Sequence, residues 1–480
     1  MEAEMYLGLD LGTSGLKALL CGADQRVLAE ARADYRADVP APGLSEQDPA
    51  VWVTATRAAV REVAARAPAI RTDLRAIGLS GQMHGLLALG ADDRPLRPAI
   101  LWNDARGGGW AGAAPRDTLA ITGVGPMPSF TAAKLHWLRG AEPAIHAAIA
   151  TVLLPKDHLR LWLTGDAATD PSDAAGTQLY DQGQGRWSDT MAAAVGLDPS
   201  ALPPIAGSAT VAGRLRRAAA EALDLPCVPV VTGAADTPAG ALAVGCTDMR
   251  HAMISLGTGA LCIAGAEGYV PPADPGLHHF AHALPGRFYR MGAILNAGSA
   301  LDWAAGVTGQ TTATALEALA ARGWGGPGRV LALPCLDGTR SPVPAPDARA
   351  MVLGLGRDTG PLDLMQAMVE GICLSLAEAH DALARGGPVA TPTVIGGGTR
   401  SALWLTILAT ALGRKIAVAD GAAGGSALGA VRLAMLGDGI DPADVLTAPA
   451  TRPVAPDPAR AAAMAALRDR YRRAWPLADL

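Results

Sequence analysis

Short apolar runs bounded by glycine recur along the chain and alternate with longer, alanine-rich stretches. The short runs have the length and residue types of β-strands, and the longer stretches place apolar residues at helical spacing. Strands are predicted at Tyr6–Leu9, Ala18–Cys21, Arg75–Leu79, Val228–Val231, Met253–Leu256 and Thr393–Ile395. Helices are predicted at Pro49–Ala67, Leu362–Arg385, Ala402–Leu412 and Ala461–Arg473. This alternation predicts an α/β fold with mainly parallel or mixed sheets.

One unit of the pattern occurs twice. Residues 6–20 predict a β-hairpin, because the gap between their two apolar runs is too short for a helix. Its turn lies in Gly8-Leu-Asp-Leu-Gly-Thr-Ser-Gly15, which is echoed by Ile254-Ser-Leu-Gly-Thr-Gly-Ala260. The echo suggests a duplicated domain with a cleft between the copies. We place the boundary near Gly245, which gives predicted domains of residues 1–245 and 246–480.

Composition narrows the class of protein. The chain has 480 residues, half of them hydrophobic, which is more than a single core accommodates. A net charge of −5 without a basic stripe argues against nucleic acid and favours small-molecule partners. The six cysteines include no CxxC pair and are expected to be reduced and buried. The longest apolar stretch, near residues 403–412, is too short to span a bilayer. We expect a cytoplasmic protein without a membrane partner.

The first hairpin carries a candidate phosphate site, Asp10-Leu-Gly-Thr-Ser-Gly-Leu-Lys17. Its glycines let the backbone approach an anion, while the amides and the hydroxyls of Thr13 and Ser14 donate hydrogen bonds. Asp10 can hold a water on Mg²⁺, which prefers one or two carboxylates plus waters. Lys17 can reach a transferring phosphoryl group. An ordinary hairpin turn explains the same residues about as well, so the motif alone leaves both interpretations open.

Two further glycine turns are candidates for nucleotide binding. One follows the strand predicted at Met253–Leu256 and can grip a triphosphate from the side opposite the first turn. The other is a glycine triplet after Thr393–Ile395, where a flat base or ribose can lie against the backbone before a capped helix begins. The candidate residues are Gly257, Thr258, Gly396, Gly397, Gly398 and Ser401. Each pattern taken alone is more typical of an ordinary turn or loop.

Two polar residues follow predicted strands. Asp236 begins a helix that has Pro238 in its first turn. It can serve as the helix N-cap, as the base that takes a hydroxyl proton during phosphoryl transfer, or as both, and the local sequence favours the cap. His84 lies in Gly81-Gln-Met-His-Gly85, which can bind sugar hydroxyls or form an ordinary loop.

Two longer stretches resemble the signatures of the FGGY carbohydrate kinase family. The first is Phe130-Thr-Ala-Ala-Lys134-Leu-His-Trp137-Leu, although Gly140 and Ala141 depart from the polar residues usual at its end. The second begins as Ala350-Met-Val-Leu-Gly354-Leu and, after seven residues, continues as Asp363-Leu-Met-Gln-Ala367-Met-Val-Glu370. The motifs follow the family's order over nearly the whole chain, and they are most similar to members that phosphorylate D-xylulose.

The resemblance implies two actin-like (ribonuclease-H-like) domains that flank a central cleft. It implies ATP and Mg²⁺, with transfer of the γ-phosphoryl group to the C5 hydroxyl of D-xylulose. By the same resemblance, Asp236 is the general base and Asp10 supports the metal and the phosphate. The expected sugar contacts are Met83, His84, Trp102, Asp236 and Thr237. The expected nucleotide contacts are Thr13, Ser14, Lys17, Gly257, Thr258, Gly396, Gly397, Gly398 and Ser401.

Two positions depart from the family pattern. Thr237 stands where Asn usually follows the catalytic Asp, which leaves another pentulose or a pentitol as an alternative substrate. The second phosphate turn reads Gly-Thr-Gly-Ala where Gly-Thr-Ser-Gly is usual, and its backbone amides still suit a phosphate. An alternative of a different class is an actin-like ATPase without a sugar substrate. The oligomeric state, including a homodimer, is left open.

Overall fold

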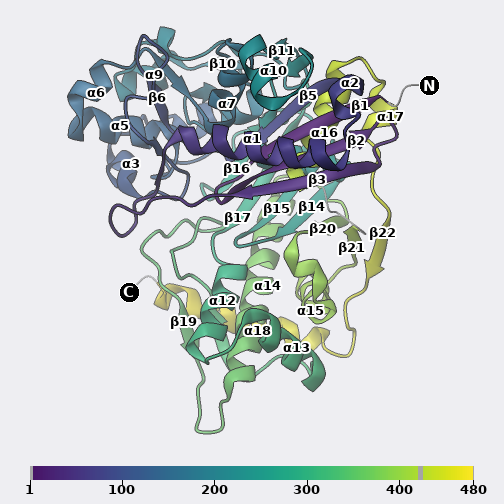
Figure 1. Cartoon of the computed structure of the whole chain (residues 1–480). Helices are drawn as coiled ribbons and strands as arrows, with labels where there is room; N and C mark the ends of the chain where they lie inside the picture. The colour runs from purple at the N-terminus through teal and green to yellow at the C-terminus, as the bar shows by residue number, and fades with distance from the viewer. Residues whose placement is uncertain (1–3, 420–424, 479–480) are drawn as a thin grey trace.

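Each half of the chain is built around one mixed seven-stranded sheet (Figure 1). The computed structural model describes residues 4–419 and 425–478, so the outermost ends of the two predicted domains lie outside it. The first sheet has the order β11-β12-β5-β1-β2-β3, with β13 paired to β5. Its strands are β1 (Met5–Leu11), β2 (Gly15–Gly22), β3 (Val27–Asp34), β5 (Leu74–Gly81), β11 (Val211–Arg214), β12 (Pro229–Val231) and β13 (Ala234–Ala235).

The second sheet has the order β16-β17-β15-β14-β20-β21-β22. Its strands are β14 (Ala252–Leu256), β15 (Ala260–Ala266), β16 (Leu277–Ala281), β17 (Phe288–Ile294), β20 (Pro392–Ile395), β21 (Ile416–Ala419) and β22 (Thr451–Val454). Four short ladders lie outside the two sheets: β4 (Glu46–Gln47) with β7 (Ala99–Ile100), β6 (Leu87–Leu89) with β8 (Thr151–Leu153), β9 (Tyr180–Asp181) with β10 (Arg186–Trp187), and β18 (Leu331–Leu333) with β19 (Met351–Leu353).

The two sheets repeat one topology. In the first, β1, β2 and β3 form an antiparallel meander, and β5 and then β12 add to the other edge of β1 in parallel. In the second, β14, β15 and β17 form the meander, and β20 and β21 add in parallel. The turns 12–15 and 257–259 occupy the same place in the two copies. The predicted hairpin and the predicted duplication are therefore present in the structure.

Helices connect the strands and cover the sheets. Those of the first half are α1 (Pro49–Arg66), α2 (Ile70–Asp73), α3 (Trp110–Ala113), α4 (Thr118–Thr122), α5 (Thr131–Ala141), α6 (Pro143–Ala147), α7 (Pro155–Thr164), α8 (Pro171–Ala175), α9 (Asp189–Val195), α10 (Arg217–Leu223) and α11 (Asp236–Ala243). Those of the second half are α12 (Gly298–Val307), α13 (Thr312–Arg322), α14 (Pro361–Arg385), α15 (Ala402–Leu412), α16 (Gly425–Gly437), α17 (Pro442–Val445) and α18 (Ala461–Ala474). Every predicted strand and helix coincides with an observed one to within three residues at each end.

Local chemistry explains where the predicted helices begin. Asp48 accepts a hydrogen bond from the Ala50 amide at 2.9 Å and caps α1. Ser401 accepts one from the Trp404 amide at 3.3 Å and caps α15. Within the described residues, no helix is both long enough and apolar enough to cross a membrane. The six cysteines are unpaired, and five are buried as expected, whereas Cys227 is exposed.

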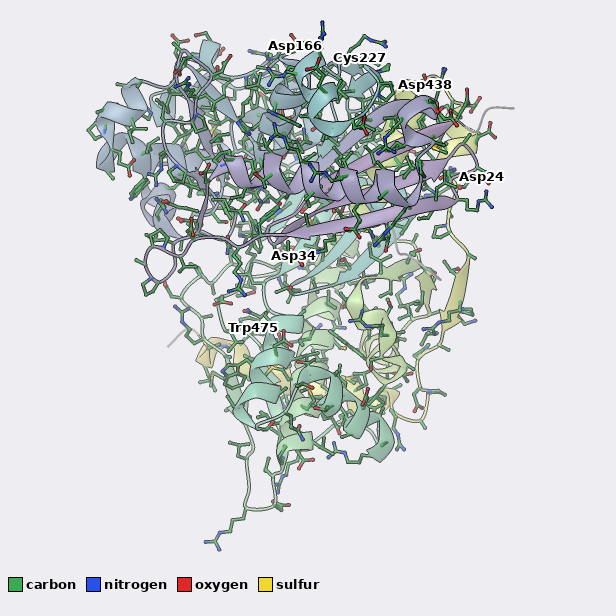
Figure 2. The ribbon with its side chains drawn as sticks, viewed as in Figure 1. Asp24, Asp34, Asp166, Cys227, Asp438 and Trp475 are labelled. Carbon is green, nitrogen blue, oxygen red and sulfur yellow. The ribbon has the colours of Figure 1, made fainter. Side chains whose placement is uncertain are left out.

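Helix α16 comes from the second half of the chain but packs on the first sheet. In Figure 1 it lies beside β1 and β2 in the upper part of the molecule. Its apolar face, with Ala427 and Val431, is buried against Tyr6 and Ala76. Beyond its end, Asp438 accepts a hydrogen bond from the Tyr6 hydroxyl at 2.8 Å (Figure 2 labels Asp438). The halves of the sequence and the halves of the structure therefore differ at this helix, and the division near residue 245 stays a prediction.

Glycines bring α16 into backbone contact with its neighbours. A Cβ on Gly8 or Gly78 would lie 2.2 or 1.8 Å from a carbonyl oxygen of α16. A Cβ on Gly429, within α16, would lie 1.9 Å from the Ala239 carbonyl oxygen of α11. These distances are far below van der Waals contact, so a side chain at any of the three positions would push α16 away. Helix α11 begins at Asp236, and its position depends on this crossing.

We predict that Gly429→Ala destabilises the protein by about 1–3 kcal/mol, because the methyl group forces the two helices apart. The displaced α11 should also move Asp236, its first residue. Gly140→Ala in α5 is the matched control, since a Cβ there meets nothing within 4 Å and alanine favours a helix. Urea unfolding of both variants checks the prediction. A loss of stability at Gly429 no larger than that of the control would contradict the tight crossing.

Candidate active site

A cavity of about 210 Å³ lies between the two halves. All five residues predicted to contact the sugar line it: Met83, His84, Trp102, Asp236 and Thr237. The second half contributes Arg340, the turn residue Gly259 and the start of β15 at Ala260. Its volume is small compared with sites for drug-sized ligands, which suits a small polar molecule.

A second, larger cavity of about 850 Å³ lies within the second half. It is bounded by α12, α13 and the start of α15, and Gly257, Thr258, Gly397, Gly398 and Ser401 line it as expected. Gly396 is not among its lining residues. Its φ of +94° instead turns the chain after β20, where a Cβ would lie 2.5 Å from the Leu256 carbonyl oxygen.

The two cavities meet at one turn. Gly257 and Thr258 line the large cavity, whereas Ser255 and Gly259, their immediate neighbours, line the small one. The Gly257 amide donates to the Gly259 carbonyl at 2.9 Å, which fixes the turn. A triphosphate that ends at this turn would therefore present its terminal phosphorus to a molecule in the small cavity.

Asp236 is the first residue of α11 and not its N-cap. The N-cap position is Ala235, and no side chain in the described part of the chain caps this helix. The carboxylate of Asp236 accepts a hydrogen bond from the Thr237 hydroxyl at 3.2 Å. Burial, together with the nearby charge of Asp10, raises the pKa of Asp236 to about 7. The structure therefore does not support the helix-cap interpretation that local sequence favours.

Asp10 lies at the end of β1, next to Asp236. Its carboxylate accepts a hydrogen bond from the Ser80 hydroxyl at 3.0 Å. Burial raises the pKa of Asp10, and the charge of Lys17 opposes this shift. Lys17 pairs with Asp10 across the β1–β2 ladder and makes an ion pair with Glu30 at 3.0 Å. The charge of Asp10 raises the pKa of Asp236, so the two carboxylates lie near each other and form a site suited to a divalent cation.

Thr13 connects the first glycine turn to the sugar cavity. Its hydroxyl accepts a hydrogen bond from the Trp102 indole at 2.8 Å and donates one to the Gln82 side chain at 3.1 Å. Ser14, the next residue, accepts one from Arg32 at 2.9 Å. Asp10, Thr13, Ser14 and Lys17 are not among the lining residues of either cavity. The structure thus gathers these four at the turn between β1 and β2, behind the cavity wall that Trp102 forms.

The loop that carries His84 is held in a strained conformation. His84 has a φ of +66°, which is unusual for a residue other than glycine. Its ring stacks on Phe130, with centroids 3.8 Å apart, and its Nδ1 lies 2.6 Å from the Gly176 carbonyl. The buried Nζ of Lys134 donates to the His84 carbonyl at 2.6 Å. Phe130 and Lys134, which belong to the first family signature, therefore position the loop that carries His84.

Burial also determines the charge of His84. It lowers the pKa of His84 well below its usual value, and the charge of Arg340 acts in the same direction. The ring is therefore neutral at physiological pH, with Nδ1 donating its proton to the Gly176 carbonyl and Nε2 left as an acceptor.

A buried ion cluster supports the strand before Asp236. The ammonium of Lys156 lies 2.6, 3.0 and 3.4 Å from the carboxylates of Asp157, Asp170 and Asp173. Asp170 in turn accepts from the Ser172 hydroxyl, which itself accepts a hydrogen bond from the Ala235 amide at 3.1 Å. This chain of contacts ties the residue preceding Asp236 to a fixed charge cluster. Its members lie on two separate segments, 156–157 and 170–173, so neither segment alone predicts the cluster.

Two family models match the chain: the N-terminal domain of the FGGY family of carbohydrate kinases over residues 5–243, and the C-terminal domain of the same family over residues 252–437. The chain therefore belongs to the FGGY family of carbohydrate kinases. It is an ATP-dependent carbohydrate kinase.

Individual proteins similar to this chain are also carbohydrate kinases. The xylulose kinase of Escherichia coli (strain K12) is 40% identical over 442 residues, which cover 90% of each chain. A crystal structure of a xyloylose kinase from Brucella ovis superimposes with a TM-score of 0.93 at 40% identity and covers 99% of both chains. The xylulose kinase from Rhodospirillum rubrum gives a TM-score of 0.87 at 30% identity, again covering 99% of both. These likenesses confirm the predicted fold of two actin-like domains.

The raised pKa of Asp236 predicts how stability depends on pH. Because the folded state binds this proton more tightly than the unfolded state, stability falls as the pH rises from about 4 to about 7. Asp236→Asn should therefore raise Tm by a few degrees at pH 8 without added metal, and this gain should vanish toward pH 4. Thermal unfolding across this range checks the prediction, with exposed Asp117→Asn as control. An equal shift of Tm at pH 5 and pH 8 would contradict it.

Proposed function

We propose that this kinase transfers the γ-phosphoryl group of ATP to the C5 hydroxyl of D-xylulose, giving D-xylulose 5-phosphate and ADP. One observation carries the proposal: the predicted sugar residues and the predicted phosphate turn line two cavities that meet between Ser255 and Gly259. The relatives at 40% identity, which are described as xylulose kinases, support the choice of sugar.

In this proposal Asp236 is the general base. It takes the proton from the C5 hydroxyl as that oxygen bonds to the γ-phosphorus and the bond to the β-phosphate oxygen breaks. A pKa of about 7 keeps a large fraction of the carboxylate ionised and still basic near neutral pH. Thr237 orients this carboxylate by its hydrogen bond. Met83, neutral His84 and Trp102 would contact the remainder of the sugar.

The large cavity would hold ATP. Gly257 and Thr258 would bind its phosphates through backbone amides, while Gly397 and Gly398 leave room for the base or ribose. Thr13, Ser14 and Lys17 lie on the opposite turn. They would contact the terminal phosphate of an ATP molecule that extends past the turn at 257–259. Gly396 and Ser401 would act indirectly, by turning the chain and by capping α15.

The residues present fit a magnesium ion. Asp10 and Asp236 are neighbouring carboxylates, and Mg²⁺ is commonly bound by one or two carboxylates, waters and substrate phosphates. The ion would neutralise phosphate charge when bound. We propose Asp10 as its main protein ligand, directly or through water.

Three further expectations from the sequence stay predictions. They are small-molecule rather than nucleic-acid partners, a cytoplasmic location and a homodimer.

A sugar panel tests the function. We expect ADP release with D-xylulose to exceed that with other pentuloses, pentitols and glycerol, and Asp236→Asn to lower kcat by about 10²- to 10⁴-fold. A coupled ADP assay measures both, with Asp117→Asn as control. A preference for another sugar would point to the alternative substrate, which the replacement of Asn by Thr237 leaves open. ATP turnover that is indifferent to any sugar would instead support an actin-like ATPase.

Asp10→Asn tests the metal assignment. Since the variant keeps the shape of the side chain but loses its charge, we expect a large loss of kcat and a higher Mg²⁺ concentration for half-maximal rate. The measurement is a Mg²⁺ titration at saturating ATP and sugar. A variant with the metal dependence of the wild type would remove Asp10 from this role.

A further inference from the structure

Arg340 brings a cation into the sugar cavity from the opposite half of the molecule. It belongs to the loop between β18 and β19, yet it lies among first-half residues. Its guanidinium is 6.0 Å from the ring centroid of Trp102 and 6.0 Å from that of Phe130. Among the described residues that line the small cavity, Arg340 is the one cation and Asp236 the one carboxylate.

Most of the hydrogen-bonding capacity of Arg340 is unused by the residues that the structure describes. Its Nη2 donates to the Ser129 hydroxyl at 2.6 Å, and this is its one side-chain hydrogen bond within residues 4–419 and 425–478. In the same part of the chain, no carboxylate lies within ion-pair distance of it. A guanidinium carries five N–H donors, so several remain for a ligand. Burial lowers the pKa of Arg340 to about 10, which leaves it charged at neutral pH.

The burial of the charged Arg340 side chain lowers the stability of the folded protein. A buried cation without a carboxylate partner loses hydration that two aromatic faces and one hydroxyl replace only in part. The neighbouring residue fixes the loop: the Ser341 hydroxyl accepts from the Ala293 amide of β17 at 2.9 Å. The loop thus holds the guanidinium in place without supplying it with an anion. Residues that cost stability in a cavity are typically retained for a ligand.

Arg340 and His84 contact the same aromatic ring at one end of the cavity. His84 stacks on Phe130, the same ring that Arg340 contacts. The charge of Arg340 lowers the pKa of His84, whereas the pKa of Asp236 responds to Asp10 and Thr237. Arg340 therefore lies at the end of the cavity where His84 stacks on Phe130.

We propose that Arg340 is a substrate-binding residue that donates hydrogen bonds to the sugar oxygens remote from the reacting hydroxyl. Ketose hydroxyl and carbonyl oxygens are the acceptors that its free N–H groups lack. Because the donor comes from the second half and Asp236 from the first, the sugar would be held from both sides of the cleft. This inference rests on the proposed function and assigns a further residue to its sugar site.

The test is a comparison of steady-state constants for Arg340→Gln and Arg340→Lys. For the sugar that the wild type prefers in the panel, we expect Arg340→Gln to raise KM on the order of 10- to 100-fold, while KM for ATP changes less than about twofold. Arg340→Lys keeps the positive charge but lacks the paired N–H donors of the guanidinium, so its KM for the sugar should rise less than that of Arg340→Gln. The exposed Arg357→Gln, in the same half, is the control.

Thermal unfolding distinguishes binding from a structural role. A ligand-binding Arg340 predicts that Arg340→Gln keeps or raises Tm without sugar, and that the sugar raises Tm less than in the wild type. Should this variant fail to fold, Ser129→Ala, which frees the guanidinium from its anchor, should raise the sugar KM by a smaller factor. A sugar KM within twofold of the wild type for the folded Arg340→Gln variant would overturn the inference, as would an equal rise in KM for ATP.

The two proposals fail in different ways. If the wild type prefers a pentitol or another pentulose, the choice of D-xylulose is wrong, and the Arg340 comparison proceeds with the preferred sugar. A preference for a sugar acid would contradict the proposal that the substrate is a neutral ketose. Arg340 would then bind the carboxylate of that acid. If no sugar stimulates ATP turnover in the wild type, both proposals are wrong.

Discussion

Helices α11 and α16 cross with no side chain between Gly429 and the Ala239 carbonyl, and the same helix α16 lies directly on Gly8 and Gly78 of the first sheet. This contact joins the two halves of the chain beneath the cleft. The Ser426 hydroxyl, at the start of α16, also donates to the Asp236 carbonyl at 2.8 Å. The location of the carboxylate next to Asp10, and so the chemistry of the cleft, depends on how closely these backbones approach.

The active site concentrates charges whose burial lowers stability. Burial raises the pKa of both Asp10 and Asp236, and Arg340 lies in the cavity without a carboxylate partner among the described residues. Such strain persists only where the surrounding structure is rigid. That support comes from Lys156 with its three carboxylates and from Lys134, which holds the backbone of His84. These two lysines thus support, from behind the cavity, the residues that line it.

Much of the fold could be predicted from sequence because its signals are local. A glycine turn between two apolar runs specifies a hairpin wherever it occurs, which is why the turns at 12–15 and 257–259 were identified and found at equivalent places. The resemblance to the family also predicted the five residues that contact the sugar, and all five line one cavity. The exact position of Asp236 was not predictable, since an N-cap and a first helical residue share the same local sequence.

The remaining features depend on contacts between distant segments. Nothing near Arg340 in the sequence indicates that Trp102 and Phe130 lie beside it, and nothing near Gly429 indicates Ala239. The packing of α16 on the first sheet likewise follows from long-range contacts and not from its own amphipathic pattern.

The central claim is that Asp236 faces a sugar hydroxyl across the cleft from the nucleotide. A crystal structure of the protein with D-xylulose and a non-hydrolysable ATP analogue tests it most directly. The account predicts a carboxylate oxygen of Asp236 within about 2.6–3.2 Å of the C5 hydroxyl, with the terminal phosphate at the turn of Gly257 and Thr258. A ketose bound elsewhere, or oriented with C5 away from Asp236, would contradict it.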